Sequence, residues 1–400
     1  MSRQPLVGGP VLVINSGSSS LKYQLVVPVD GEVLASGLIE RIGEVSGRAT
    51  HTSSGRSHTI ESAVVDHGAA LRVLHDQFAE HGPDLDQAGV VAVGHRVVHG
   101  GPDFSTPVII DDAVESEIDA LSPLAPLHNP AAVAGIRAAR ARFGVPHVAV
   151  FDTAFFTGLP SEAKTYAIPA ELAVRHKIRR YGFHGTSHAY VAGRAAEVLE
   201  RPAVGLNLVI FHLGNGASVS AVTDGRAIET SMGLTPLQGL VMGTRSGDID
   251  PSIYPFLRDA AAMSIADTDT MLNHRSGVKG LSGVNDFRLL EDRMTEDPAA
   301  RLAFDVYIHR LRHYLGAYAF LLGRLDAVVF TAGVGENSPM VRAAALAELT
   351  EFGIRLDPDR NAPRSKDPRI ISTDDSGVTV LVVPTNEELS IARQAQQLVG

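Results

Sequence analysis

Three glycine-rich turns in this sequence follow apolar runs and could cradle a phosphate. They are Asn15-Ser-Gly-Ser-Ser-Ser-Leu-Lys22, His212-Leu-Gly-Asn-Gly216 and Gly333-Val-Gly-Glu-Asn337. Glycine has no Cβ, so backbone N–H groups in such turns can approach a bulky anion closely. The third turn also precedes a predicted helix near Pro339, whose N-terminus favours negative charge. One such turn is typical of an ordinary loop, but three at strand ends indicate a nucleotide-binding protein.

Two common nucleotide-binding signatures are absent from the sequence. No Gly-x4-Gly-Lys-[Ser/Thr] occurs, and no strand–Gly-x-Gly-x-x-Gly–helix fingerprint occurs. A P-loop and a dinucleotide-binding Rossmann unit are therefore not expected. If a nucleotide binds, the three turns must hold its phosphates.

Two arginines lie in glycine-rich settings that suit an anion clamp. Arg96 stands in His95-Arg-Val-Val-His-Gly-Gly101, and Arg245 in Met242-Gly-Thr-Arg-Ser-Gly-Asp-Ile-Asp250. A guanidinium keeps its charge and binds planar oxyanions through two parallel hydrogen bonds. A surface ion pair is the alternative for any single arginine. The glycine-rich surroundings and the missing P-loop lysine favour the clamp.

Several histidines cluster in motifs that could act on a phosphoryl group. His184 and His188 lie in Tyr181-Gly-Phe-His-Gly-Thr-Ser-His188, and His212 opens the second turn. The sequence has no His-Glu-x-x-His pattern, so a zinc site is not expected. We expect His184 to donate a hydrogen bond to a phosphoryl oxygen, and His188 to lie at the start of a helix.

Two carboxylates are placed where a magnesium ion could be organised. Asp152 directly follows an apolar run, and Glu387 lies in Pro384-Thr-Asn-Glu-Glu388. A carboxylate at the carboxyl end of a strand points into the ligand crevice of an open α/β sheet, and Mg²⁺ takes one or two carboxylates while keeping most of its waters. Glu387 also suits the first turn of a helix.

The elements that would position these residues alternate between strands and helices, as in α/β proteins. Apolar residues spaced by three and four predict a helix through Phe304 to Leu322 that ends near Gly323. Short runs rich in β-branched residues predict strands at 11–14, 147–151, 206–211 and 327–331.

A weak internal repeat relates two parts of the chain. Residues 11–20 and 208–218 both read as an apolar strand, a glycine turn and small hydroxyl residues, and Asp30-Gly31 and Asp224-Gly225 follow as hairpin signals. This pattern predicts two similar domains that face one another across a cleft, with a boundary near Phe151–Asp152. The alternative is that strand–turn–strand units recur in any α/β protein.

Composition excludes several classes of protein. The 400 residues are 44% hydrophobic, contain no cysteine and carry a formal net charge of −10, so thiolate chemistry and disulfides are excluded. The acidic balance makes a nucleic-acid partner unexpected. No apolar run reaches the roughly 18 residues of a membrane span and no signal peptide is visible. We expect a soluble, cytoplasmic protein without a membrane partner.

Taken together, these motifs resemble those of the acetate kinases. Phe151-Asp-Thr-Ala-Phe155, Thr244-Arg-Ser-Gly-Asp-Ile-Asp-Pro251 and Thr385-Asn-Glu-Glu388 complete the set, in the family's order and along nearly the whole chain. The resemblance implies an α/β fold with two similar domains, built on the duplicated βββαβαβα core of sugar kinases, actin and heat-shock ATPases around an interdomain cleft. The domains would cover 1–151 and 152–387, with a C-terminal helix 388–400 packing back onto the first.

The resemblance also implies an activity and a set of partners. These are reversible, direct in-line phosphoryl transfer between ATP and acetate to give ADP and acetyl phosphate, with Mg²⁺ or Mn²⁺ as the metal, in a homodimer. Arg96 and Arg245 would hold the carboxylate and the phosphoryl group, His184 would stabilise the transition state, and Asp152 would be the essential acid. Asn15 and Glu387 would organise the metal.

The remaining residues of the resemblance form two groups. Those for the acetate methyl group are Val98, Leu127, Phe183 and Pro236. Those for the nucleotide are Lys22, His212, Leu213, Gly214, Asn215, Gly216, Asp286, Phe287, Arg288, Gly333, Val334, Gly335, Glu336 and Asn337. Three departures from the family pattern are Phe156 in place of histidine, Val278-Lys279 in place of two leucines, and Asn285 in place of serine.

Acetate is already ionised at neutral pH, so no general base is needed to make the nucleophile. We therefore hypothesise that Asp152 positions Mg²⁺ through water, or orients an arginine. Three alternative functions stay open at this point: a propionate or butyrate kinase, a non-enzymatic ATP-driven module of the actin or chaperone kind, and a sugar kinase. Arg96 beside a small apolar pocket suits a carboxylate better than a polyol.

Overall fold

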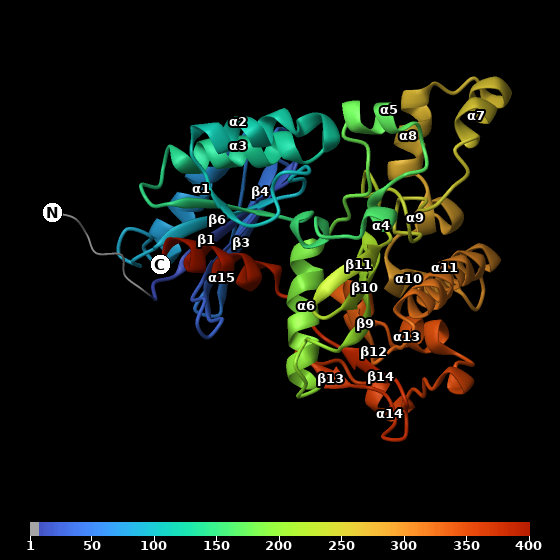
Figure 1. The fold of residues 1–400 in the computed structure, drawn as a ribbon. Helices are drawn as coiled ribbons and strands as arrows, with labels where there is room; N and C mark the ends of the chain where they lie inside the picture. The colour runs from blue at the N-terminus through green and yellow to red at the C-terminus, as the bar shows by residue number, and fades with distance from the viewer. Residues whose placement is uncertain (1–7) are drawn as a thin grey trace. The chain divides into compact units, whose positions relative to one another are not determined.

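The computed structural model describes residues 8–400, and they divide into two compact units (Figure 1). Unit 1 contains the chain up to Ala154 together with Asn386–Gly400, and unit 2 contains Phe155–Thr385. No helix among the described residues is both long enough and apolar enough to cross a bilayer.

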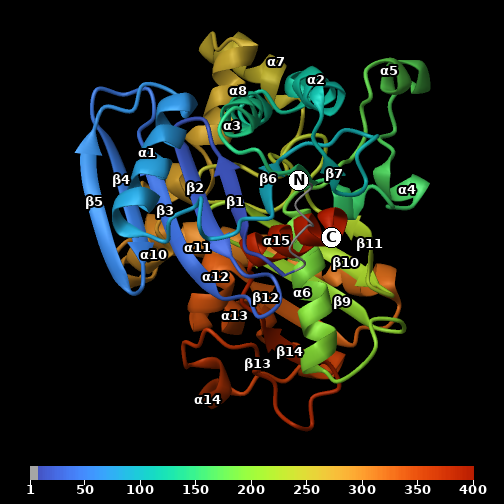
Figure 2. The same cartoon turned by 90° about the vertical axis from the view of Figure 1, so that its left-hand side faces the viewer.

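Unit 1 is built on an eight-stranded sheet with the order β5-β4-β3-β2-β1-β6-β8-β7 (Figure 2). Strands β1, β6 and β8 run parallel, and β2 to β5 continue the sheet from β1 as antiparallel hairpins. The strands are β1 (Val11–Ser16), β2 (Ser20–Val26), β3 (Val33–Glu40), β4 (Gly47–Ser53), β5 (Arg56–Ser62), β6 (Ala92–Val97), β7 (Val108–Ile109) and β8 (His147–Phe151).

Helices cover both faces of this sheet. Val93 packs in one core cluster with residues of α1, whereas a Cβ on the neighbouring Gly94 would meet Ile391 of α15. Since successive strand residues point to opposite faces, α1 and α15 lie on opposite sides of the sheet. The helices are α1 (His67–His81), α2 (Asp112–Ala120), α3 (Asn129–Arg140), α15 (Glu387–Val399) and a 3₁₀ turn at Ser122–Leu124.

Unit 2 repeats the strand order of unit 1 on a six-stranded sheet, β11-β10-β9-β12-β14-β13. Strands β9, β12 and β14 run parallel like β1, β6 and β8, and β10 and β11 run antiparallel like β2 and β3. The strands are β9 (Asn207–Leu213), β10 (Ala217–Thr223), β11 (Arg226–Thr230), β12 (Ala327–Thr331), β13 (Arg369–Ile370) and β14 (Thr379–Val382). The shared order confirms the predicted repeat and the duplicated α/β fold.

The helices of unit 2 pack on this second sheet. Helix α6 buries Val191, Ala192 and Ala195 against strands β9, β12 and β14. Helix bounds are α4 (Ser161–Lys164), α5 (Ala170–Arg175), α6 (Gly185–Val198), α7 (Ile253–Ala261), α8 (Ile265–His274), α9 (Gly277–Ser282), α10 (Phe287–Arg293), α11 (Pro298–Leu322), α12 (Ala332–Asn337), α13 (Pro339–Leu346) and α14 (Pro358–Asn361), with 3₁₀ turns at Ala154–Phe156 and Thr350–Phe352.

The predicted strands are all present, and those at 147–151 and 327–331 have the predicted limits. Strand β1 extends to Ser16 rather than residue 14, and β9 covers Asn207–Leu213 rather than 206–211. Helix α11 ends at Leu322, and its C-cap Gly323 has a φ of 70°, which glycine adopts easily. Residues 333–337, predicted as an open loop, instead form the short helix α12. The Glu336 carboxylate accepts from the Ala332 N–H, and the Asn337 amide donates to the Gly333 carbonyl, so side chains close the turn into a helix.

Two buried histidines in the unit 1 sheet give stability a pH dependence. His95 and His147 join through Nε2 and Nδ1 at 2.9 Å, and His147 Nε2 reaches the Phe143 carbonyl. Burial lowers the pKa of both imidazoles. The folded protein therefore binds protons on these imidazoles less readily than the unfolded chain does, so stability is full above about pH 6.5 and falls as the pH drops below it.

Lowering the pH from about 7.5 to about 5.5 should therefore reduce the free energy of unfolding by about 1 kcal/mol per histidine. Urea denaturation followed by circular dichroism at both pH values measures this difference. His95→Gln should show a smaller difference, and the exposed His274→Gln is the matched control. An equal pH dependence in His95→Gln and wild type would contradict the assignment.

Candidate active site

In unit 1, the predicted polar residues gather at the carboxyl ends of three parallel strands. Asn15 lies at the end of β1, Arg96 at the end of β6, and Asp152 directly follows β8. Helix α15 begins at Glu387 and packs against the same strands. The parallel alignment of β1, β6 and β8 brings these side chains to one edge of the sheet.

Arg96 and Asp152 form a bidentate ion pair at this edge. Arg96 Nη2 donates to Asp152 Oδ2 at 2.7 Å, and Nε lies 3.2 and 3.0 Å from the two carboxylate oxygens. Asp152 is 1% exposed, so its charge is compensated inside the protein. Arg96 Nη1 lies 3.4 Å from Glu387 Oε2. A guanidinium has five N–H groups, so Arg96 retains donors for a bound anion.

The carboxylates keep Arg96 ionised. Burial alone lowers the pKa of Arg96, but the charge of Asp152, followed by that of Glu387, raises it well above its usual value. Burial raises the pKa of Glu387, and the charge of Arg96 opposes that shift. The hydrogen bonds from Arg96 to Asp152 hold the guanidinium against this carboxylate.

The residues present fit a magnesium ion that is bound mainly by water molecules and substrate phosphates, with few protein ligands. Asn15 pairs with Lys22 across β1 and β2, and Lys22 forms an ion pair with Glu388. Within residues 8–400, no three His, Cys, Asp or Glu side chains are gathered as a metal cage. The amide of Asn15 and the carboxylate of Glu387 are hard oxygen donors, of the kind that Mg²⁺ takes in ones or twos beside its waters and substrate phosphates.

In unit 2, His184 and Arg245 converge on one point. A Cβ built on Gly216 would lie 3.4 Å from Arg245 Nη1 and 3.5 Å from His184 Nε2. His184 is the N-cap of α6, with a left-handed φ of 59°. Backbone strain of this kind in a non-glycine residue collects at functional sites. The His184 ring stacks on that of His212 at 4.3 Å between centroids.

Arg245 is a half-buried cation that suits an anionic ligand. Its Nη1 donates to the Pro236 carbonyl at 3.1 Å, and among residues 8–400 no carboxylate forms an ion pair with it. Burial lowers the pKa of Arg245. A phosphoryl group bound next to Gly216, where the Arg245 and His184 side chains converge, would supply the missing negative charge.

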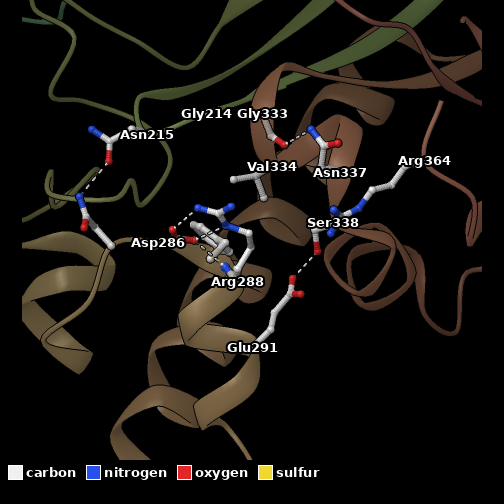
Figure 3. A pocket seen from close by; sticks show the side chains of 12 residues that line it. Gly214, Asn215, Asp286, Arg288, Glu291, Gly333, Val334, Asn337, Ser338 and Arg364 are labelled. Carbon is white, nitrogen blue, oxygen red and sulfur yellow. Dashed lines mark hydrogen bonds and ion pairs between the residues drawn. The ribbon is translucent and has the colours of Figure 1, made fainter. Parts of the chain in front are cut away.

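A cavity of about 460 Å³ in unit 2 lies beside the second and third turns (Figure 3). Its volume is in the range of small-molecule and cofactor sites. Eight of the predicted nucleotide residues line it, namely Gly214, Asn215, Asp286, Phe287, Arg288, Gly333, Val334 and Asn337. Four further lining residues were not predicted to bind nucleotide: Asn285, Glu291, Ser338 and Arg364.

The walls of this cavity are held by side-chain contacts. Asp286 caps α10, and hydrogen bonds from Arg288 lower the pKa of Asp286 to about 2. Ser338 donates to Glu291 and thereby links α13 to α10. Asp286 and Arg288 form an ion pair, so the other charged side chains that line the cavity are those of Glu291 and Arg364 (Figure 3).

A buried arginine outside the predicted set supports the third turn. Arg342 is 0% exposed, and its Nη1 donates to the carbonyls of Gly335 and Glu336 at 2.8 and 3.0 Å. Its Nε and Nη2 donate to Asn361. Arg342 therefore holds the C-terminal end of α12, whose residues Gly333, Val334 and Asn337 line the cavity of Figure 3. A helical arginine gives no sequence signal for this role.

The other predicted residues are divided between the two units. Lys22, Val98 and Leu127 belong to unit 1, and Leu127 is 53% exposed. Phe183 is buried in unit 2, where Pro236 also lies. His212, Leu213, Gly216, Gly335 and Glu336 do not line the cavity of Figure 3. His212 Nδ1 contacts Ser187 at 2.8 Å, and Glu336 accepts from the Thr385 N–H.

Phe156 and Asn285, two of the residues that depart from the family pattern, both form specific side-chain contacts. Phe156 is 0% exposed and meets the His188 ring edge-on at 5.6 Å. Asn285 donates to the Asn215 side chain at 3.4 Å across the cavity. His188, predicted at a helix start, lies in the first turn of α6, where it is buried between two serines.

Gly216→Ala tests the convergence of His184 and Arg245. The new methyl group would meet both side chains at ordinary contact distance, so the fold should keep its thermal midpoint. The methyl would occupy the space we assign to the phosphoryl group, so kcat should fall by about tenfold or more. Steady-state kinetics beside a melting curve measures both quantities. Wild-type kcat in a folded Gly216→Ala protein would contradict this placement.

The sequence profile of the acetokinase family matches residues 10–393. The chain belongs to the acetokinase family. It is 58% identical over 393 residues to a protein named acetate kinase from Leifsonia xyli subsp. xyli, with 98% of this chain and 99% of that protein aligned. Family membership confirms the resemblance seen in the motifs.

Solved structures of the acetokinase family have the same fold. The crystal structure of Porphyromonas gingivalis acetate kinase aligns with a TM-score of 0.93 at 39% identity, covering 98% of this chain and 100% of that chain. A propionate kinase from Francisella tularensis subsp. tularensis aligns with a TM-score of 0.91 at 41% identity, covering 97% and 99%. The two-unit architecture is therefore that of the family.

Proposed function

We propose that this acetokinase-family protein catalyses reversible, direct in-line transfer of the γ-phosphoryl group of ATP to acetate, giving acetyl phosphate and ADP. The observation that carries the proposal is the convergence of His184 and Arg245 beside Gly216, in the unit that holds the cavity of Figure 3. The name of the Leifsonia relative supports acetate as the acceptor.

Phosphoryl transfer requires that the reacting groups are positioned and that the negative charge of the transferring phosphoryl group is compensated. Its transition state is loose, with negative charge spread over the three equatorial oxygens of the moving group. Arg245 would neutralise that charge, and His184 would donate a hydrogen bond from Nε2. Both groups are placed before the reaction, so they need little reorganisation when charge develops. The turns at Gly214 and Gly333 would hold the nucleotide phosphates.

Arg96 would bind the acceptor carboxylate. Acetate is ionised at neutral pH, so no side chain needs to remove a proton from it. Asp152 would serve by holding the Arg96 guanidinium in one orientation through two hydrogen bonds. Val98, Leu127, Phe183 and Pro236 are proposed to contact the acetate methyl group.

Asn15 and Glu387 would hold Mg²⁺ through their oxygens. When bound, Mg²⁺ compensates the charge of the nucleotide phosphates and orients them. Glu387 begins α15 and contacts Arg96, so its carboxylate links the metal ligands to the acceptor site. Mn²⁺ takes the same hard oxygen ligands and should substitute.

A hydroxamate assay tests the activity. Purified protein with ATP, Mg²⁺ and acetate should form acetyl phosphate, which hydroxylamine traps as acetohydroxamate. Omitting Mg²⁺ or acetate should abolish the product. ATP hydrolysis that does not require acetate would favour an ATP-driven module and contradict the proposal.

Propionate is the competing acceptor, because the propionate kinase of Francisella has nearly the same fold. One methylene in an apolar pocket changes the free energy of binding by only about 1–3 kcal/mol, so we expect the enzyme to prefer one acceptor without rejecting the other completely. We expect kcat/KM for acetate to exceed that for propionate by about tenfold or more. The reverse order would identify a propionate kinase.

We further infer a homodimer in the cytoplasm, as the family resemblance implies. Light scattering of the eluted protein should give twice the chain mass of 42.4 kDa. Neither inference enters the mechanism.

A further inference from the structure

Three side chains of unit 2, those of Ser220, His188 and Ser218, form a chain of hydrogen bonds that ends at His184. Ser220 Oγ lies 2.8 Å from His188 Nδ1, and His188 Nε2 lies 2.8 Å from Ser218 Oγ. Ser218 Oγ in turn lies 3.0 Å from His184 Nδ1. Ser218 and Ser220 lie on one face of β10, because they are two residues apart, and His188 lies in the first turn of α6.

The middle of the chain is closed to water. His188, Ser218 and Ser220 are all 0% exposed. The aromatic rings next to His188 are those of Phe156, edge-on at 5.6 Å, and His212, tilted at 6.0 Å. Burial, followed by the charge of His212, lowers the pKa of His188 well below its usual value. A neutral His188 has one N–H and one acceptor nitrogen.

The direction of the hydrogen bonds follows from Ser220. Among residues 8–400, His188 is the one hydrogen-bond partner of the Ser220 hydroxyl. If Ser220 accepted from His188, its own O–H would be buried without an acceptor, which is unfavourable. Ser220 therefore donates to His188 Nδ1, His188 donates from Nε2 to Ser218, and Ser218 donates to His184 Nδ1.

We propose that Ser218 is a positioning residue that keeps His184 in the neutral tautomer protonated at Nε2. This inference rests on the proposed function, in which His184 donates to the phosphoryl group. Nε2 is the atom that faces the Gly216 point, so the chain of hydroxyls and imidazole aims a neutral N–H donor at the transferring group. His184 then needs no positive charge to act, and Arg245 supplies the charge.

Nitrogen NMR of the wild-type protein reads this tautomer directly. Protein labelled with [¹⁵N]histidine should show, near pH 7.5, His184 with Nδ1 unprotonated and Nε2 protonated. His184→Gln assigns the signals by their loss. A protonated Nδ1, with or without a protonated Nε2, would overturn the proposal. This readout needs no enzymatic activity, so it stands apart from the hydroxamate test of the proposed function.

A double-mutant cycle then measures whether Ser218 acts through His184. Ser218→Ala removes one hydrogen bond to a catalytic group, so kcat should fall by about tenfold with KM for acetate and ATP nearly unchanged. In the His184→Gln background, the same substitution should cause no further loss. An equal loss in both backgrounds would show a merely structural role and overturn the proposal.

The matched control is Ser231→Ala. Ser231 is also buried next to this sheet, but its hydroxyl accepts from the Val219 N–H and, within residues 8–400, forms no hydrogen bond with a histidine. It should leave kcat and the His184 signals unchanged. Where Ser218→Ala fails to fold, the wild-type NMR spectrum still decides the proposal.

Discussion

Replacing Arg245 with alanine should lower kcat by about a thousandfold, by analogy with arginines that neutralise a transferring phosphoryl group. The guanidinium is half-buried beside Gly216 and forms no ion pair with a carboxylate of the described chain. Its charge is therefore available to the transition state. Because the negative charge grows on the moving group, the loss should fall mainly on kcat.

Steady-state kinetics with ATP and acetate varied separately measures this split. Arg245→Lys keeps the charge but loses the planar fork, and it should recover only part of the rate. Arg258→Ala is the control, because Arg258 pairs with Asp259 on the surface of α7. A change confined to KM in Arg245→Ala would mean that the residue only binds substrate.

Replacing Asp152 with asparagine should lower kcat/KM for acetate by about a hundredfold, the size of effect expected when a group that positions the substrate is misplaced. The bidentate contact with Arg96 is lost, so the guanidinium that receives the acceptor carboxylate is no longer held. Raising the pH should not restore the rate, because acetate has no proton to lose.

Asp119→Asn is the matched control, since it breaks an Arg–Asp pair on the exposed surface of the same unit. It should leave kcat/KM unchanged. Rescue of Asp152→Asn at alkaline pH would indicate a general base. Full activity of Asp152→Asn with an unchanged Mg²⁺ dependence would show that Asp152 neither orients Arg96 for catalysis nor positions Mg²⁺.

Sequence reasoning located the parts of the site that depend on local chemistry. The segments at Gly214 and Gly333 follow strands β9 and β12, and both line the cavity of Figure 3, which we propose holds the nucleotide. Glycine turns at strand ends can be recognised because backbone approach to an anion demands them. The repeat was also visible in the sequence, because the two similar strand–turn–strand segments begin sheets in which the corresponding strands have the same order.

Residues that act through tertiary contacts could not be found in the same way. Arg342 is indistinguishable from a surface arginine in the sequence, because its burial depends on Asn361 and on the carbonyls of α12. Ser218 and Ser220 did leave a signal, as two hydroxyls at alternate positions of a buried strand. That spacing places both on one face of a strand, but only the fold shows His188 between them.

The most direct test of the central claim is a single turnover with [γ-³²P]ATP, Mg²⁺, acetate and an excess of purified protein. Quenching one portion in hydroxylamine measures acetohydroxamate and released phosphate, and quenching a second portion in cold acid without hydroxylamine preserves any label bound to the protein. We expect one equivalent of hydroxamate per ATP consumed, at the same rate as ATP loss, with no label left on the protein. Label retained on the protein at a competent rate, or phosphate released without hydroxamate, would contradict direct transfer to acetate.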